Sequence, residues 1–357
     1  MKQEDKKKIY FFLKYDFISA STRQRFLSYF KYKPKNINIE TNILFDNQYF
    51  SKKILNKNIP IIKIFFSYLN RIYKLLILPK KSKIIIQSEL LPYFPNLIEK
   101  ILVYKKIKYI IDLDDAFFHR YDQSNNFLIN FFLKKKYHYI FKNAFLSILG
   151  SKYLNKKARE FGAKKTIIIP TGIIYNDYKK FNKIKKNKVF TIVWIGSPST
   201  TKYLINIFPA LEALNKKIKF VLRLIGSQSI ETSYLPIESF PWSKDTENIL
   251  LSQSHVGIMP LNNTFWEQGK CAFKLIQYMG AGLPVIGSAV GENISVISHK
   301  KNGFLAYNNS DWFNYLYYLY KNLKVRKNFG KYSKDVVIKK YSIENMQKVF
   351  WKNINLL

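Results

Sequence analysis

The sequence has 357 residues, of which 47% are hydrophobic and 17% aromatic, enough apolar surface for two packed domains. Its 60 Lys and Arg residues against 23 Asp and Glu residues give a formal net charge of +37. The single cysteine, Cys271, excludes an internal disulfide framework and a cysteine-rich zinc site. It fits a reducing compartment such as the cytoplasm, and we interpret Cys271 as a small buried side chain.

The net positive charge has three possible sources, and the composition supports them to different degrees. Most of it is compositional drift, because Lys, Ile, Asn, Phe and Tyr are the residues that an AT-rich genome favours, and all are abundant here. Nucleic-acid binding is disfavoured, because the lysines are spread along the whole chain and no helix-turn-helix, zinc-finger or RNP spacing occurs. Contact with a negatively charged membrane face stays open.

No segment has the roughly 20 uninterrupted apolar residues of a membrane-spanning helix. Near the N-terminus Lys14 interrupts the apolar run, which predicts a first strand rather than a signal peptide. Residues 61–78 and 127–145 are basic and rich in aromatic residues, and we predict amphipathic helices there. Each helix either covers one side of a sheet with its lysines in solvent, which is the favoured alternative, or lies on an anionic membrane surface.

Strand and helix patterns alternate along the chain, which is typical of βαβ units and a parallel sheet. In the first half, apolar runs bounded by loops occupy residues 8–15, 83–87, 108–112, 145–149 and 166–169. The charged segment 179–188 lacks apolar periodicity and predicts a linker. A second series, in which each strand runs into a loop of Gly, Ser or Pro, occupies residues 189–200, 219–229, 255–261 and 283–291.

The loops of the second series are predicted to bind a ligand, because ligands bind beyond the carboxyl ends of strands in such sheets. "WIGSPSTTKYL" places Gly196 and Ser197 after a strand and Lys202 at the start of a helix, where N–H groups and a cation suit a diphosphate. "GKCAFKLIQYMGAGLPVIGSAVGEN" at 269–293 predicts a helix, a tight turn and a strand. We expect this helix to deliver Lys274 and Gln277 to the same place.

In the first half, "IDLDDAFFHRYD" places Asp112, Asp114, Asp115 and His119 at the end of a strand. These side chains either position a substrate or cap the following helix. Arg23 and Arg25, in the loop after the first strand, are expected to meet a donor phosphate or an anionic acceptor. The other histidines, His138, His255 and His299, are isolated from candidate ligands, and we interpret them as structural.

These motifs carry a family resemblance. The segment from 260 to 306, together with "VWIGSPSTTKYL", resembles the nucleotide-sugar-binding half of family 4 glycosyltransferases, which have the GT-B fold. "SASTRQRF", "IDLDDAFFHRYD" and "GSKYLNKKAREFGAKKTIIIPTGI" resemble segments of a bacterial subgroup of that family, so the resemblance covers nearly the whole chain. It implies an α/β protein of two facing Rossmann-like, doubly wound domains: residues 1–180 on the acceptor side and 187–340 on the donor side. The helix at 341–357 would cross back to the first domain.

Carried over to this sequence, the resemblance places Ser197, Lys202, Lys270 and Lys274 near the donor diphosphate. Gln277 stands where the family's second glutamate holds the nucleotide ribose. Gly269 stands in place of the first glutamate, with Glu267 two residues away. The change to Gln still allows hydrogen bonds to ribose hydroxyls, whereas the contact to the sugar is placed in doubt.

The resemblance implies a hexosyltransferase that moves a sugar from a nucleotide-diphosphate sugar to a hydroxyl with retention of configuration. GT-B enzymes of this kind bind the diphosphate with lysines and arginines, so we expect no metal and no cofactor.

The basic helices motivate the hypothesis of a cell-envelope glycan or lipid-linked acceptor at the inner face of the cytoplasmic membrane. The expected catalytic residues are Lys202, Lys274, His119 and Asp115. The expected donor-binding residues are Gly196, Ser197, Gly226, Ser227, Glu267, Lys270, Gln277 and Gly291. The expected acceptor-side residues are Arg23, Arg25, Asp112 and Asp114.

Three other functions remain open. A GT-B-like sugar-nucleotide epimerase would leave the basic helices unexplained, and a non-catalytic sugar-nucleotide-binding protein would fit the loss of both glutamates. A basic nucleic-acid-binding protein would bind polyanions with a steep salt dependence. The nucleotide base, the sugar, the acceptor and the oligomeric state are not determined by the sequence.

Overall fold

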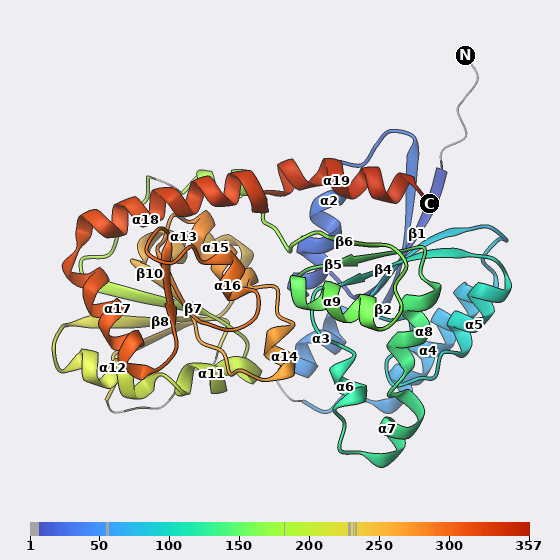
Figure 1. The fold of residues 1–357 in the computed structure, drawn as a ribbon, viewed down its shortest axis with the longest axis horizontal. Helices are drawn as coiled ribbons and strands as arrows, with labels where there is room; N and C mark the ends of the chain where they lie inside the picture. The colour runs from blue at the N-terminus through green and yellow to red at the C-terminus, as the bar shows by residue number, and fades with distance from the viewer. Residues whose placement is uncertain (1–6, 55–56, 182, 228–229, 231, 233) are drawn as a thin grey trace. The chain divides into compact units, whose positions relative to one another are not determined.

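The computed structural model describes residues 7–357 apart from 55–56, 182, 228–229, 231 and 233. Contacts divide the chain into two compact units, the first made of residues 1–171, 269–271 and 346–357 and the second of 172–268 and 272–345 (Figure 1). Residues 172–180, which we placed in the first domain, cluster with the second. The reason is local: Ile173 bridges to Ser342, and Tyr178 packs into an apolar core of the second unit.

The first unit contains a six-stranded sheet of order β2-β1-β3-β4-β5-β6, in which each neighbouring pair of strands is parallel. The strands are β1 (Lys7–Tyr15), β2 (Ile37–Phe45), β3 (Lys83–Gln87), β4 (Lys108–Leu113), β5 (Leu146–Leu149) and β6 (Thr166–Ile168). The five predicted segments are confirmed as strands, and β2 is an edge strand that we did not predict. The strand order reverses between β1 and β3, which makes that position the topological switch point.

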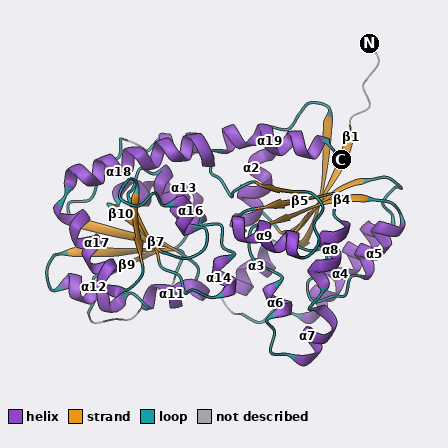
Figure 2. Ribbon diagram, viewed as in Figure 1, coloured by secondary structure: helices purple, strands orange, loops and turns teal. Residues whose placement is uncertain are grey.

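The helices of the first unit follow the strands and cover the sheet (Figure 2). They are α1 (Ala20–Thr22), a π-helical turn (Arg23–Leu27), α2 (Ser28–Phe30), α3 (Asn47–Ile54), α4 (Ile61–Leu76), α5 (Leu97–Tyr104), α6 (His119–Asp122), α7 (Phe127–Leu133), α8 (Lys136–Asn143) and α9 (Lys152–Glu160). The Ser151 side chain caps α9 by accepting from the Leu154 N–H at 3.3 Å.

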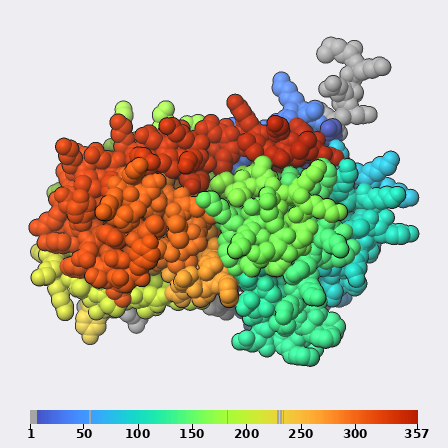
Figure 3. Space-filling view, in the orientation of Figure 1, coloured from blue at the N-terminus to red at the C-terminus, as the bar shows by residue number. Residues whose placement is uncertain are grey.

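The helix predicted over 127–145 is broken into α7 and α8. Lys136, at the start of α8, is 3% exposed because its ammonium group pairs with a buried carboxylate, so the expectation of solvated lysines is wrong at this position. Residues around α7, coloured green, stand out from the surface of the first unit (Figure 3). α7 exposes Phe127, Phe131 and Phe132, whereas α8 buries Ile140 and Phe141.

The amphipathic helix predicted over 61–78 is confirmed as α4, but its apolar face is not turned inward. Of its residues, only Arg71 and Leu75 are buried, whereas Ile61, Phe65 and Phe66 are all more than half exposed. Arg71 anchors the helix, since its guanidinium donates to the Leu13 carbonyl at 2.7 Å and the Asn42 carbonyl at 3.0 Å. The favoured expectation, a helix that covers one side of a sheet with its lysines in solvent, agrees with the packing of α4 on β2 and with the exposure of Lys63 and Lys74, but the exposed apolar residues were not expected.

The second unit contains a six-stranded sheet of order β12-β11-β10-β7-β8-β9, again parallel throughout. The strands are β7 (Phe190–Ile195), β8 (Phe220–Ile225), β9 (Ile237–Phe240), β10 (Val256–Met259), β11 (Val285–Ser288) and β12 (Gly303–Ala306). The four predicted segments are confirmed as β7, β8, β10 and β11. Here the switch point lies between β7 and β10.

Successive side chains of β7 point to opposite faces of this sheet, so the second unit has two apolar cores. Ile192 and Trp194 belong to one core, and Val193 and Ile195 belong to the other. The helices are α10 (Tyr175–Lys179), a 3₁₀ turn (Pro198–Thr200), α11 (Thr201–Ile205), α12 (Phe208–Asn215), α13 (Lys244–Gln253), α14 (Phe265–Gln268), α15 (Phe273–Gly280), α16 (Asn293–Val296), α17 (Asn309–Lys321), α18 (Leu323–Val336) and a π-helical turn (Val337–Tyr341).

The last helix, α19 (Ile343–Asn355), is shared between the units, because residues from 346 onward cluster with the first. The Phe350 ring stacks on Tyr29 with centroids 4.3 Å apart, and the Trp351 indole N–H donates to the Tyr29 carbonyl at 3.1 Å. The predicted return of the C-terminal helix to the first domain is confirmed. Within the described part of the chain, no helix is sufficiently long and apolar to cross a membrane.

Candidate functional site

The loop after β7 lies at the switch point of the second sheet and holds the predicted diphosphate-binding residues. The Gly196 N–H donates to the Ile225 carbonyl at 2.9 Å, and a Cβ at position 196 would lie 2.1 Å from the Trp194 ring. Only glycine therefore fits against this indole. Ser197 follows, with its hydroxyl 3.0 Å from that of Ser199. The helix α11 begins at Thr201 but has only five residues, so its dipole is weak and the expected helix field is largely absent.

The two predicted catalytic lysines lie on either side of this loop. Lys202 is the second residue of α11 and is exposed, with its ammonium group 5.4 Å from the Tyr203 ring centroid. Lys274, in the first turn of α15, holds its ammonium group 4.6 Å from the Trp194 ring centroid. Because the same indole packs against Gly196, Lys274 is brought beside the β7 loop. Each ammonium group thus lies within about 6 Å of an aromatic ring centroid, and contact of the two lysines with a diphosphate stays a prediction.

Hydrogen bonds join the loops that follow three neighbouring strands. After β7 and β8, the Thr201 and Ser227 hydroxyls lie 2.9 Å apart. Glu267, in the segment after β10, accepts from the hydroxyls of Tyr203 and Thr264 and is only 4% exposed. The carboxylate of Glu267 therefore fixes the β10 loop to the β7 loop. Both oxygens of Glu267 are thus engaged within the protein, and its listing as a donor-binding residue stays a prediction.

Gln277 lies in the middle of a buried polar chain. Its amide donates to the Glu247 carboxylate at 2.6 Å and lies 3.5 Å from the Tyr178 hydroxyl. Glu247 also accepts from the Trp242 indole N–H. A carboxylate supplied by α13 thus stands next to Gln277. Sequence reasoning missed Glu247, because it precedes Gln277 by 30 residues and lies outside every motif.

The glycines of the 269–293 segment have mainly packing roles. Gly282 has φ of +71° at the turn after α15, as predicted for a tight turn, whereas a Cβ on Gly280 would lie 2.3 Å from Ile173. Gly291 has φ of +52°, and a Cβ there would lie 2.7 Å from the Gln268 carbonyl. The backbone at Gly291 therefore comes close to the backbone of Gln268. Gly226, with φ of +84°, lies against Gly196 and Trp242.

At position 269, where the resemblance would place a glutamate, packing explains why the residue is glycine. Residues 269–271 cluster with the first unit, and a Cβ at Gly269 would lie 2.4 Å from the Cβ of Ala116. No side chain fits there without a shift of the backbone. Lys270 belongs by its contacts to the first unit, whereas Lys274 belongs to the second.

Arg25 and Asp112 form a bidentate ion pair at the carboxyl edge of the first sheet. The guanidinium donates to the two carboxylate oxygens at 2.6 and 2.7 Å and also to the Ile169 carbonyl at 2.9 Å. Both side chains are at most 3% exposed. Burial alone would lower the pKa of Arg25, but the charge of Asp112 outweighs it and raises that pKa. For Asp112, burial outweighs the charge of Arg25 and raises the pKa of the carboxyl above its ordinary value. The pair ties β4 to the segment after β6.

The other acceptor-side residues lie around this pair. Asp114 accepts from the Ser21 hydroxyl, and its backbone carbonyl lies 2.7 Å from the Cys271 sulfur. Cys271 is buried, as expected. Arg23 donates to the Phe17 and Ile18 carbonyls at 3.1 and 2.6 Å, so it holds the loop after β1. The backbone carbonyl of Asp115 accepts from the Phe117 N–H at 2.8 Å, which makes a tight turn after β4.

His119 uses both ring nitrogens inside the first unit. Its Nδ1 lies 2.8 Å from the Asp122 carboxylate and its Nε2 lies 2.8 Å from the Tyr153 hydroxyl. The ring is 8% exposed. This arrangement joins α6 to α9. A catalytic role for His119, which we predicted, would require one of these partners to be exchanged for a substrate.

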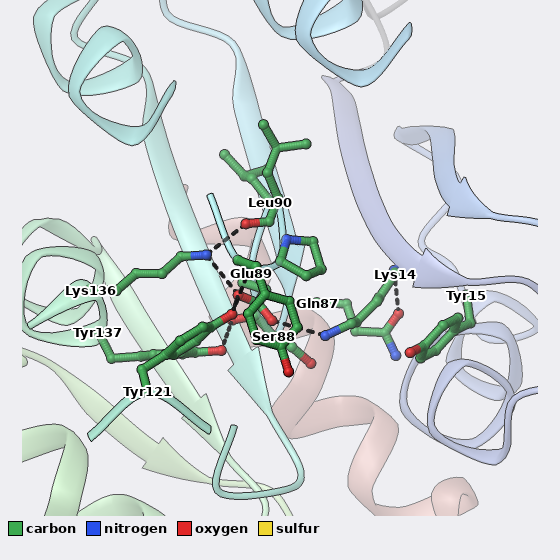
Figure 4. Close-up of polar contacts among 12 residues, drawn as sticks. Lys14, Tyr15, Gln87, Ser88, Glu89, Leu90, Tyr121, Lys136 and Tyr137 are labelled. Atoms are coloured by element: carbon green, nitrogen blue, oxygen red, sulfur yellow. Dashed lines mark hydrogen bonds and ion pairs between the residues drawn. The ribbon is translucent and has the colours of Figure 1, made fainter. Parts of the chain in front are cut away.

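A second group of buried charges lies at the switch point of the first sheet, where Figure 4 shows two ammonium groups converging on Glu89. The Glu89 carboxylate is 2.9 Å from the Lys14 ammonium, 2.7 Å from that of Lys136 and 2.6 Å from the Tyr121 hydroxyl. Glu89 has no exposed surface, and both lysines are at most 3% exposed. Ser88, immediately before it, has φ of +63°, a conformation that costs energy for serine.

Glu89 stays ionised because it has two cationic partners. Burial alone would raise the pKa of its carboxyl, but Lys14 and Lys136 outweigh burial and hold that pKa well below its usual range. We did not predict this cluster. One signal was available, since Lys14 interrupts an apolar strand and Glu89 follows another strand within two residues.

Within the described residues, no group of three or more His, Cys, Asp or Glu side chains is arranged to hold a metal ion.

Replacing Glu89 by Gln is expected to lower the free energy of unfolding at pH 7 by about 3–5 kcal/mol, because two buried ammonium groups lose their counterion. The folded pKa of Glu89 is depressed, so its stabilisation is complete above the unfolded pKa of about 4.3 and declines as pH falls below it. Urea unfolding at pH 7 and pH 3 measures both effects. The matched control Glu160→Gln removes a surface ion pair and should cost less than about 1 kcal/mol. Equal losses in the two variants would contradict a buried ion cluster.

Gln277→Glu is expected to destabilise the protein by about 1–3 kcal/mol at pH 8, because it places a second carboxylate beside Glu247. The loss should shrink as pH falls, since the pair then shares a proton. The double variant Glu247→Gln/Gln277→Glu keeps one carboxylate and one amide and should recover most of the stability. Thermal unfolding of the three proteins measures this coupling, and a fully stable Gln277→Glu variant would show that the two side chains are not in contact.

Comparison with known proteins agrees with this architecture. Residues 189–322 match the family model described as "Glycosyl transferases group 1". No curated protein matches. Among solved structures, Anabaena HepE in complex with UDP is similar with a TM-score of 0.70 at 13% identity, and covers 98% of this chain and 100% of its own.

Two further structures are similar over nearly their full length. A glycosyltransferase from Rickettsia africae has a TM-score of 0.67 at 16% identity, and covers 98% of this chain and 98% of its own. Sucrose-phosphate synthase from Thermosynechococcus elongatus has a TM-score of 0.66 at 12% identity, and covers 98% and 99%. At these identities the likeness establishes the fold. The chain thus has the GT-B fold, and residues 189–322 form its glycosyl transferases group 1 domain.

Proposed function

We propose that this protein is a family 4 glycosyltransferase that moves a hexose from a nucleotide-diphosphate sugar to a hydroxyl, with retention of configuration and without a metal ion. The observation that carries the proposal is the set of loops at the switch point of the second sheet, inside the matched domain. In these loops Ser197 and Lys202 follow β7, and Ser227 follows β8. Lys274 lies at the start of α15. Lys202 and Lys274 are the two predicted catalytic lysines. HepE has been crystallised with UDP and with UDP-glucose, which supports a nucleotide-sugar donor.

Departure of the nucleotide diphosphate leaves negative charge on its oxygens and oxocarbenium character on the sugar. Lys202 and Lys274 are placed to stabilise that charge, and the N–H groups of the Gly196–Ser197 loop add hydrogen-bond donors. Because α11 is short, the lysine side chains supply most of the electrostatic stabilisation. Gln277 and Glu247 together offer an amide and a carboxylate for the ribose hydroxyls.

The first unit is the proposed acceptor domain. Asp114 and Asp115 follow β4 beside the Arg25–Asp112 ion pair, which holds that loop in place. A carboxylate there would orient the attacking hydroxyl. His119 is proposed to act through its hydrogen bonds to Asp122 and Tyr153, which position α6.

The donor proposal predicts that one of UDP, GDP, ADP, CMP and TDP raises the melting temperature of the full chain. A ligand that binds only the folded state adds about 2.7 kcal/mol at 100 times its Kd. The shift should persist in EDTA, and Lys202→Ala and Lys274→Ala should each remove most of it. Lys216→Ala, which removes an exposed lysine at the end of α12, is the control and should keep it.

If no nucleotide changes the melting temperature, the donor site is lost and a polyanion-binding protein becomes the better explanation. If a nucleotide binds but no sugar is transferred, the protein is a non-catalytic binder or an epimerase. Product analysis by NMR separates these outcomes, since it reports both the acceptor linkage and its anomeric configuration.

We further propose that the acceptor is a lipid-linked or cell-envelope glycan, reached from the cytoplasmic face of a membrane. Support comes from the exposed apolar residues of α4 and α7 together with exposed lysines, such as Lys63 within α4 and Lys134 directly after α7. Such helices bind at the headgroup boundary of anionic bilayers. A groove of about 260 Å³ lies beside α7 and is lined by Tyr93, Pro95, Leu128, Ile129, Phe132 and Leu133.

The membrane proposal predicts that the protein sediments with vesicles containing phosphatidylglycerol at 0.15 M NaCl. At this salt concentration, interactions between exposed charges more than about 8 Å apart are largely screened. Phe131→Ser/Phe132→Ser should reduce the bound fraction several-fold, because it removes exposed aromatic rings from α7. Tyr307→Ser, a change of an exposed ring in the second unit, should have no effect. Absence of the wild-type protein from the vesicle pellet would overturn the proposal.

A further inference from the structure

The second unit contains a cavity of about 390 Å³ whose walls are strongly basic. Among the described residues that line it, none is acidic. The basic ones come from three parts of the chain and are Lys186, His255, Arg326, Lys327, Lys331 and Lys334. The volume falls within the range of about 300–1,000 Å³ that is typical of small-molecule sites.

Helix α18 supplies four of these basic side chains because of its sequence spacing. Lys327, Lys331 and Lys334 are four and three residues apart, and Arg326 directly precedes Lys327, so all four side chains leave the same side of the helix. The helix is held close to the turn after α15, since a Cβ at Gly330 would lie 2.2 Å from the Gly282 carbonyl. Arg326 donates to the Tyr320 carbonyl at 2.7 Å and is thereby fixed.

His255 adds a hydrogen-bond donor of defined direction. Its Nδ1 accepts from the Thr191 N–H at 2.9 Å, so the proton of the neutral ring is on Nε2. Burial, together with the charges of Arg326 and Lys186, lowers the pKa of His255 to about 4. Burial, together with Lys334 and Arg326, lowers the pKa of Lys186 to about 8, although that side chain still reaches solvent. These groups repel one another, and a bound anion would relieve that repulsion.

The position of the cavity separates it from the donor loops. His255 and Pro284 immediately precede β10 and β11, so the cavity opens at the amino ends of these parallel strands. The donor loops follow the carboxyl ends of the same sheet. α15 runs between the two regions, carrying Lys274 in its first turn and ending two residues before Gly282.

We propose that this cavity is a binding site for a multiply phosphorylated small molecule, distinct from the donor site. Lysine and arginine side chains bind phosphoryl oxygens with charge-assisted hydrogen bonds. The His255 Nε2–H gives a further donor, and Pro284 and Leu323 offer an apolar wall for the rest of the ligand.

The test is calorimetric titration of the full chain with sodium tripolyphosphate at 0.15 M NaCl. Lys327→Ala/Lys331→Ala removes two exposed side chains of the cavity and should weaken binding by roughly tenfold or more, since charge-assisted contacts are lost. Lys321→Ala/Lys324→Ala makes the same change of charge nearby, outside the cavity, and should leave the Kd within about twofold. Lys202→Ala/Lys274→Ala should also leave it unchanged, which separates this site from the proposed donor site.

Equal weakening by the cavity and control pairs would mean non-specific attraction to a basic protein and would overturn the proposal, as would an unaltered Kd in the cavity variant. A lipid headgroup is the alternative source of the phosphoryl groups. Vesicles of phosphatidylcholine with phosphatidic acid distinguish it: binding that depends on Lys327 and Lys331 assigns the site to a lipid, and binding that does not assigns it to a soluble ligand.

Discussion

Each strand in the two sheets runs parallel to its neighbours, and this constraint decides where polar chemistry can lie. Parallel strands are covered by helices on both faces, so their middles must be apolar and only their ends meet loops. Charged and hydroxyl residues therefore gather where strands end. In the first sheet Glu89 and Asp112 lie at the ends of β3 and β4, and in the second Ser197 and Ser227 follow β7 and β8. The same rule leaves the opposite edge of the second sheet to the basic cavity.

Charge is treated differently in the interior and on the surface. An exposed lysine needs no partner, so a net charge of +37 is tolerated in water. A buried charge must be matched, and the first unit matches Arg25 with Asp112 and joins Lys14 and Lys136 to Glu89. The cavity beside α18 departs from this balance, since the described residues around it are basic without a carboxylate. That imbalance distinguishes a prepared anion site from solvated lysines elsewhere.

Long apolar runs predicted most of the strands, because a buried parallel strand reads as a nearly continuous apolar segment. β2, β9 and β12 escaped prediction: each is an edge strand, and in β2 and β9 polar and apolar residues mix. Residue types at the strand ends also predicted a donor site there, and its location stays a prediction. The hydrogen-bond partners of these residues could not be predicted, because they are distant in the sequence. Tyr153 lies 34 residues after His119, and Glu247 lies 30 residues before Gln277. Tertiary contact alone reveals that His119 and Glu267 are engaged within the protein.

The division of α19 between the units has a consequence for synthesis on the ribosome. Tyr29 belongs to the first segment to emerge, but the ring that stacks on it, Phe350, emerges only after the whole second unit. At about 5–20 residues per second the gap between these two rings is on the order of 15–65 s. During that time the nascent first unit exposes an apolar surface that α19 later covers. A chaperone that shields this surface, or early folding of the second unit, would shorten the period in which the chain is open to aggregation.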